Sequence, residues 1–271
     1  MGGGIVQTIA QAGIDVWMKG RSQESADKAI TKMDKGLKRL VERGKITEEQ
    51  KNKIFKKIHT TISFDDIKDG DLIIEAVAED MEIKINMLKQ LDEICKPESI
   101  FATNTSSFSI TELSMATNRP EKVIGMHFFN PVPVMKLVEI IKGQHTNEIV
   151  YNTVRDFAEE IGKTAVTVNE SPGFIVNRLL LPMINEGIGA LADGVATKEE
   201  IDTAMKLGAS HPMGPLALAD LIGLDVCLAI MEVLHCEFGD DKYRAHPLLR
   251  KMVRANLLGR KTGKGFYDYN R

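Results

Sequence analysis

The chain is poor in cysteine and in aromatic residues, and it carries almost no net charge. Its three cysteines, Cys95, Cys227 and Cys236, have no CxxC spacing and are odd in number, which indicates reduced thiols of a cytosolic protein rather than a disulfide framework. The 35 Lys and Arg against 38 Asp and Glu leave a net charge of −3, which does not favour nucleic acid as a partner. The six histidines include no HxxxH pair, so we predict no metal site.

Long apolar runs are absent as well. No apolar run reaches about 18 residues, and no basic segment followed by an apolar one opens the chain, so neither a membrane span nor a signal peptide is predicted. There is no repeat with a period of about 20 to 50 residues. We therefore expect a cytoplasmic protein without a membrane partner, and its 271 residues suffice for one large domain or two smaller ones.

The apolar patterns change character near Pro172. Before this residue, strand-like runs alternate with helical stretches such as Met81 to Ile94, which predicts an α/β domain with a mainly parallel sheet over 1–171. After it the patterns are helical, near 174–193, 197–207, 214–237 and 246–255, which predicts an all-α domain over 172–271. The expected strands are Asp15 to Lys19, Asp71 to Val77, Ser99 to Ala102, Lys122 to Met126, Met135 to Ile141 and Ala165 to Val168.

Two ionisable residues, His127 and Glu139, bracket an otherwise apolar run, HFFNPVPVMKLVE. The run predicts strand, Asn-Pro turn and strand, which could bring the histidine beside the carboxylate. A buried imidazole loses affinity for its proton and a neighbouring carboxylate restores it, so such a pair can serve as a general base. The alternative is a structural His–Glu pair in a core.

Polar residues flank this run on both sides in the sequence. Asn104-Thr105-Ser106-Ser107 follows an apolar strand-like segment, and Asn177 lies on the first turns of a helix that enters through Ser171-Pro172-Gly173. Together with His127, Ser106 and Asn177 could bind a carbinol oxygen while its proton is removed. Taken singly, each is typical of a helix cap or a turn.

Five separated motifs make the chain resemble the 3-hydroxyacyl-CoA dehydrogenase family, and within it the short bacterial 3-hydroxybutyryl-CoA dehydrogenases. The resemblance covers nearly the whole chain, with the motifs in the order of the family. They are Thr103 to Ser107, Gly125 to Pro131, Pro172-Gly173-Phe174 with Asn177-Arg178, His211 to Pro215, and Gly259 to Tyr267.

The resemblance implies a Rossmann-like first domain and a division of labour among the polar residues. His127 would take the hydroxyl proton while hydride leaves for the nicotinamide, and Glu139 would hold and stabilise the imidazole. Ser106 and Asn177 would hydrogen-bond the substrate oxygen or the thioester carbonyl, and Asn130 would support the loop or the nicotinamide. The reaction would interconvert a short-chain 3-hydroxyacyl-CoA and the 3-ketoacyl-CoA.

A helix expected from Ser25 to Arg43 carries a second signal. Five cations at helical spacing lie on one face, opposite an apolar face; they are Lys28, Lys32, Lys35, Arg39 and Arg43. The family places a helical hairpin here against coenzyme A, so these cations are expected to meet its phosphates. The alternative is the solvated face of an amphipathic helix.

The cofactor site is where the chain departs from its family. A dinucleotide-binding unit begins with a strand and G-x-G-x-x-G, whereas this chain begins at Met1 with Gly2 matching the third glycine. We expect the functional protein to carry the strand and a Gly-x-Gly pair upstream of Met1. After the first expected strand, Gly20-Arg21-Ser22 replaces the acidic residue of an NAD enzyme, which predicts NADP(H) as the preferred cofactor with NAD(H) possible; the alternative is a simple turn.

Two further residues match family positions near the cofactor. These are Glu79 and Lys84. The alternative interpretation is that they belong to an exposed helix start with acidic residues in its first turn.

The second domain also bears on assembly. The run 214–231 is apolar nearly all round, which is typical of a helix buried on more than one side. With the resemblance, this predicts a homodimer or higher homo-oligomer through the substrate and dimerisation domain. Two other functions stay open: a related hydroxy-acid or sugar-acid dehydrogenase, and a catalytically silent binding or structural protein that lost the cofactor.

Overall fold

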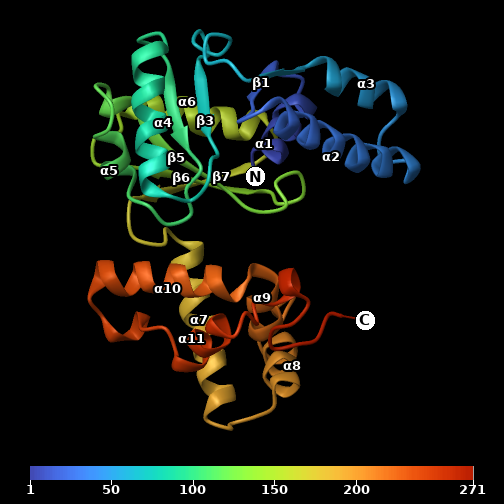
Figure 1. The fold of residues 1–271 in the computed structure, drawn as a ribbon, viewed down its shortest axis with the longest axis vertical. Helices are drawn as coiled ribbons and strands as arrows, with labels where there is room; N and C mark the ends of the chain where they lie inside the picture. The colour runs from blue at the N-terminus through green and yellow to red at the C-terminus, as the bar shows by residue number, and fades with distance from the viewer. Residues whose placement is uncertain (271) are drawn as a thin grey trace. The chain divides into compact units, whose positions relative to one another are not determined.

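The structure, a computed structural model, describes residues 1–270 and divides the chain into two compact units, Met1–Ser171 and Pro172–Arg271. The first unit is a mainly parallel α/β unit and the second is helical (Figure 1), which confirms the predicted fold class. A chain that alternates strands and helices folds in this way because each crossover helix covers a sheet face that would otherwise be exposed.

The larger sheet of the first unit has the strand order β3-β4-β5-β6-β7, with all neighbours parallel except β5 and β6. The antiparallel pair forms because the Asn-Pro turn is too short for a crossover. All six residues of β5 are buried, as expected of a central strand. The strands are β3 (Leu72–Glu75), β4 (Ile100–Thr103), β5 (Val123–Phe128), β6 (Leu137–Lys142) and β7 (Thr164–Asn169).

Alternation along β5 and β6 separates the two faces of this sheet. Ile124, Met126 and Phe128 pack with Ile5 of α1 (Gly2–Gln11) and with α6 (Glu148–Glu160). The opposite face carries Gly125, on which α5 (Ile110–Ser114) packs so closely that an added Cβ would lie 2.8 Å from a carbon of Ile110. Since side chains two residues apart share a face, His127 points to the face that α5 covers, and so does its partner in register on β6.

A second, two-stranded parallel sheet pairs β1 (Val16–Lys19) with β2 (Ile58–Thr61). Between these strands the chain forms a helical hairpin of α2 (Gln23–Glu42) and α3 (Glu48–Lys56), which Figure 1 shows beside β1. Each helix starts with a capping box, at Ser22 and at Thr47. Strand β2 is absent from the sequence-based assignment, because Ile-His-Thr-Thr is short and mixed in polarity.

The remaining helix of the first unit, α4 (Met81–Ile94), lies next to α5 in Figure 1 and contacts it. It begins at Asp80, whose side chain caps the helix by accepting from the Ile83 N–H. Leu88 and Leu91 on its inner face are buried.

In the second unit, α7 (Val176–Ala192) contacts each of the other four helices, and Figure 1 shows it running along the unit. The single helix expected over 214–237 is wrong: Gly223, with φ of 106°, separates two helices. A residue with a side chain is strained at that angle, so glycine permits the break. The other helices are α8 (Lys198–Gly208), α9 (Pro215–Ile222), α10 (Leu224–Phe238) and α11 (Pro247–Arg254).

Three observations on residues 1–270 concern membrane-spanning helices, metal ions and cysteines. No helix in this part of the chain is long and apolar enough to cross a membrane. No group of three or more His, Cys, Asp or Glu residues there could hold a metal ion. The three cysteines are not disulfide-bonded; Cys95 and Cys227 are buried and Cys236 is exposed.

Candidate active site

The histidine and the glutamate that bracket the Asn-Pro turn are paired in the structure. His127 on β5 and Glu139 on β6 are opposite each other in the antiparallel register, and His127 Nδ1 lies 2.7 Å from Glu139 Oε2. His127 is 6% exposed and Glu139 1%. The ring of Phe129 covers the imidazole, with 4.5 Å between ring centroids. The carboxylate therefore fixes the ring orientation and favours the tautomer that carries its proton on Nδ1.

The polar segment after β4 lies beside the end of β5. Asn104 Oδ1 accepts a hydrogen bond of 2.9 Å from the Phe128 N–H, next to His127. The Thr105 hydroxyl is buried and accepts from the N–H groups of Ser107 and Phe108. Hydrogen bonds at both ends thus hold the loop that presents Ser106, which is half-buried.

Glu79, between β3 and α4, is the main acceptor for this loop. Its Oε1 accepts from Thr105 Oγ1 at 2.6 Å, from the Ser106 N–H at 2.7 Å and from Ser106 Oγ at 3.0 Å. Burial raises the pKa of Glu79, but the hydrogen bonds from Thr105 and Ser106 and the charge of Lys84 outweigh burial, so the pKa lies below its ordinary value. Glu79 is therefore an ionised acceptor near neutral pH.

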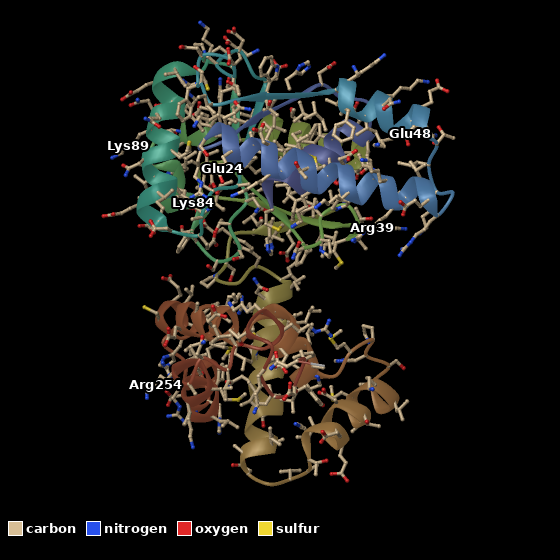
Figure 2. All side chains as sticks on the ribbon, turned by 45° about the vertical axis from the view of Figure 1, so that its right-hand side comes forward. Glu24, Arg39, Glu48, Lys84, Lys89 and Arg254 are labelled. Atoms are coloured by element: carbon tan, nitrogen blue, oxygen red, sulfur yellow. The ribbon has the colours of Figure 1, made fainter. Side chains whose placement is uncertain are left out.

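Lys84 on α4 (Figure 2) is fully buried. Its Nζ lies 2.9 and 3.0 Å from the two carboxylate oxygens of Glu75 and 3.4 Å from Glu79 Oε2. Glu75 also accepts from Thr103 Oγ1 and from the Val77 N–H, each at 2.7 Å. Lys84 thus lies behind the Ser106 loop, within a network of buried charges.

Asn130 lies in the exposed turn between β5 and β6, and no hydrogen bond from its side chain is formed within residues 1–270. The rest of this turn is held by Lys163, whose ammonium donates to the carbonyls of Val132 at 2.5 Å and Met135 at 2.8 Å. Burial lowers the pKa of Lys163. The two hydrogen bonds from Lys163 therefore anchor the turn that carries Asn130.

Asn177 belongs to the second unit, on the first turn of α7. The chain enters this helix through Gly173 and Phe174, both with positive φ. An added Cβ at Gly173 would also lie 2.8 Å from Leu234, so both backbone angle and space require glycine here. The grouping of Asn177 with His127 stays a prediction.

The residues expected to meet a dinucleotide lie at the start of α1 and the end of β1. Gly2 and Gly3 open α1, whose first turn carries no acidic residue, so its backbone N–H groups and the positive end of its dipole suit a phosphate. Arg21 is exposed and forms no ion pair within residues 1–270, while the Ser22 hydroxyl caps α2 by accepting from the Ser25 N–H. Gly20 is enclosed, since a Cβ would lie 3.0 Å from the Ser22 carbonyl oxygen. The binding of a dinucleotide by Gly20, Arg21 and Ser22 stays a prediction.

The basic stripe is exposed along α2 as expected; it comprises Lys28, Lys32, Lys35, Arg39 and Arg43. Figure 2 shows Glu24 and Arg39 towards opposite ends of this helix. At the first end, Lys28 pairs with Glu24 at 2.6 Å in a contact where both side chains are about three-quarters exposed. Such a pair contributes little to stability and can open, so the whole stripe is accessible to an anion.

The contacts of three residues of this site, Glu75, Thr103 and Asn104, do not follow from the sequence. Asn104 was seen as part of a polar cluster, but its bond to β5 depends on strand order, which no local pattern reveals. Glu75 and Thr103 are opposite each other on β3 and β4. A lone carboxylate within the apolar run Leu-Ile-Ile-Glu-Ala-Val was the available signal.

Each of the two units matches the model of a known protein family. The family model described as "3-hydroxyacyl-CoA dehydrogenase, NAD binding domain" matches residues 1–171, and "3-hydroxyacyl-CoA dehydrogenase, C-terminal domain" matches residues 173–269. The chain belongs to the 3-hydroxyacyl-CoA dehydrogenase family. This confirms the resemblance drawn from the motifs.

Individual members of the 3-hydroxyacyl-CoA dehydrogenase family agree over the full length. A 3-hydroxybutyryl-CoA dehydrogenase of Clostridioides difficile is 62% identical over 271 residues, covering 100% of this chain and 96% of the relative. The human mitochondrial hydroxyacyl-coenzyme A dehydrogenase is 40% identical over 276 residues, covering 99% and 88%. The crystal structure of (S)-3-hydroxybutyryl-CoA dehydrogenase from Ralstonia eutropha superposes with a TM-score of 0.98 at 49% identity, covering 100% and 96%.

Proposed function

We propose that this protein is a cytoplasmic oxidoreductase that interconverts 3-hydroxybutyryl-CoA and acetoacetyl-CoA with a nicotinamide cofactor. The observation that carries the proposal is the buried His127–Glu139 pair at 2.7 Å, beside the anchored Ser106 loop. Family membership over both units supports the reaction type. The names of the relatives at 62% and 54% identity support the four-carbon substrate.

His127 acts as the general base in the oxidation of the alcohol. Because Nδ1 faces Glu139, the substrate proton is taken up at Nε2, and the imidazolium that results is stabilised by the Glu139 carboxylate. In the opposite direction the same imidazolium donates this proton to the oxygen of the ketone. Ser106 and Asn177 bind the substrate oxygen or the thioester carbonyl, and so hold the reacting carbon in place.

When bound, the nicotinamide cofactor supplies or accepts the hydride at C3 of the substrate. The N-terminal turn of α1, with Gly2, binds its diphosphate. Arg21 and Ser22 donate hydrogen bonds to a 2′-phosphate, and Gly20 supplies no carboxylate to repel it, so NADP(H) is preferred over NAD(H). Glu79 and Lys84 shape this side of the site, and Asn130 supports the nicotinamide.

Coenzyme A lies along α2. Its 3′-phosphate and diphosphate face the basic stripe, where the exposed cations Lys32, Lys35 and Arg39 form no ion pair within residues 1–270. The stripe attracts a polyanion by charge, at a strength that depends on salt. A free hydroxy acid without the nucleotide makes no use of this surface, which separates the proposal from a hydroxy-acid dehydrogenase.

The second unit supports a homodimer. Most of the apolar run 214–231 is buried within the unit itself, including Leu216, Leu224 and Met231, so the run is not unpartnered throughout. Leu221 and Val226 remain 48% and 40% exposed, next to the Gly223 break. These residues form the interface we propose. Sedimentation equilibrium at micromolar concentration checks it: a dimer is expected, and a monomer that sediments ideally over the whole range contradicts it.

A substrate panel tests the proposed function. Acetoacetyl-CoA, free acetoacetate and a sugar-acid substrate are each offered with NADH and with NADPH, and cofactor absorbance is followed. We expect rapid turnover of acetoacetyl-CoA alone. Faster reduction of free acetoacetate would favour a hydroxy-acid dehydrogenase, and no turnover with any substrate would favour a silent homologue.

A further inference from the structure

We propose that Glu75 and Lys84 are positioning residues that hold the Glu79 carboxylate in place and thereby set the direction of the Ser106 hydroxyl beside the end of β5. This inference rests on the proposed function, in which Ser106 binds the ligand. Neither Glu75 nor Lys84 touches the reacting atoms in this role, because both act through Glu79.

The first observation is a fully buried ion pair between Glu75 and Lys84. The side chain of Lys84 is 0% exposed and that of Glu75 is 1% exposed. Removing two charges from water carries a large free-energy cost, and apolar residues of similar volume are often as stable in such places. A pair of this kind is therefore weak evidence for stability and calls for another role.

The second observation is that Glu75 is fully satisfied. Each of its oxygens accepts two hydrogen bonds: Oε1 from Lys84 and Val77, and Oε2 from Lys84 and Thr103. Its partners come from the segment after β3, from β4 and from α4. Glu75 thus fixes the Lys84 ammonium relative to the carboxyl ends of two strands, where the Ser106 loop begins.

The third observation is that Lys84 reaches a second carboxylate. Glu79 Oε2 lies 3.4 Å from its Nζ, while Glu79 Oε1 accepts from Thr105 and Ser106. The two oxygens of Glu79 therefore have separate partners, the fixed cation on one side and the active-site loop on the other. The carboxylate cannot turn away from Ser106 without leaving Lys84.

The chemical consequence concerns a single hydrogen. An ionised carboxylate can only accept, so the Ser106 hydroxyl donates its one hydrogen to Glu79, and this bond fixes the position of the Ser106 oxygen beside the end of β5. If Glu79 became protonated, it could donate to Ser106 instead, and the hydroxyl would reverse. Lys84 opposes this because its charge lowers the pKa of Glu79 against the effect of burial.

Two variants of the full-length protein separate this role from simple stabilisation. Lys84→Met removes the cation, and the double variant Glu75→Gln with Lys84→Met also avoids an unpaired buried carboxylate. The matched control is Lys51→Met, since Lys51 is 6% exposed and bridges Asp34 and Glu48 in the helical hairpin.

The first measurement does not depend on activity. The Glu79 side-chain carboxyl is titrated by carbon NMR and assigned by its loss in Glu79→Gln. We expect its midpoint to rise in both Lys84 variants and to stay unchanged in the control. An unchanged midpoint in the Lys84 variants overturns the proposal.

The second measurement is the pH profile of kcat/KM for acetoacetyl-CoA. Both Lys84 variants should lose about tenfold or more at neutral pH, the scale of one charge-assisted hydrogen bond, and their decline on the acid side should begin at a higher pH. Ser106→Ala should cost less in the double variant than in the wild type, because the two act in series. Losses equal to those of Lys51→Met, or fully additive losses, overturn the proposal. A wild type inactive with acetoacetyl-CoA overturns the proposed function instead, while the NMR titration still decides whether Lys84 controls Glu79.

Discussion

Replacement of His127 by glutamine is the most informative perturbation of the site. Glutamine is similar in size, and its amide can donate to Glu139 across the 2.7 Å contact, so the buried carboxylate keeps a partner and the unit stays folded. It cannot carry a proton. General acid–base catalysis typically supplies about 10² to 10⁴ in rate, so kcat should fall by that factor while KM for acetoacetyl-CoA changes little.

Glu139→Gln measures the second half of the pair. It removes the charge that stabilises the imidazolium but keeps the hydrogen bond, so the loss is that of one charge-assisted interaction, about 1.5 to 3 kcal/mol. At about 1.4 kcal/mol per tenfold, kcat should fall by roughly 10-fold to 150-fold, less than in His127→Gln.

The assay is steady-state reduction of acetoacetyl-CoA, with thermal unfolding measured on each variant. His59→Gln is the control, because His59 pairs with Asp15 at 3.6 Å at the exposed edge of the first unit. It should keep full activity. Turnover of His127→Gln within a few-fold of the wild type would refute the assignment of the base.

Three further outcomes are expected. Arg21→Met should lower kcat/KM for NADPH by about tenfold and leave NADH nearly unaffected, because only NADPH carries the 2′-phosphate. Charge reversal at Lys28, Lys32 and Arg39 should raise KM for acetoacetyl-CoA far more than KM for an acetoacetyl-pantetheine analogue without the nucleotide. Glu79→Gln should make the melting temperature less sensitive to acid: the folded-state pKa of Glu79 lies below its ordinary value of 4.5, so its contribution to stability is present above that value and is lost as the pH falls below it.

Each of these has a result that contradicts it. Equal losses of kcat/KM with NADPH and NADH would show that Arg21 is only a turn residue. Equal KM changes for both thioesters would show that the basic stripe is only a solvated helix face. Charge reversal at Lys53, which pairs with Glu49 on α3, is the control for a general change of charge. Parallel acid melting of Glu79→Gln and wild type would show that Glu79 is not coupled to folding.

Local patterns predicted a large part of the fold. The strands β5 and β6 followed from two apolar runs around an Asn-Pro turn, and the same pattern indicated that His127 could lie beside Glu139. The break at Gly223 was missed because apolar residues continue on both sides of it, although a single glycine in such a run is a breaker signal.

The site residues also divide into those that local sequence predicts and those that it does not. His127 and Glu139 were predictable because they are neighbours across one hairpin, which local sequence encodes. The Glu75–Lys84–Glu79 network was not, because no local pattern shows that Lys84 at the start of α4 folds back onto the end of β3 and is buried there. Lys163 was missed for a similar reason: a lysine after a helix is usually solvated, and only the tertiary fold shows it buried under the turn of Asn130.

We infer that His127 moves the proton in the interconversion of acetoacetyl-CoA and 3-hydroxybutyryl-CoA. The most direct test incubates acetoacetyl-CoA and NADPH with wild type and with His127→Gln, and quantifies the acyl-CoA products by chromatography. We expect the wild type to form 3-hydroxybutyryl-CoA in a one-to-one ratio with the NADPH consumed, and the variant to form it at least about 10²-fold more slowly. Absence of this product with the wild type, or equal rates for the two proteins, would contradict it.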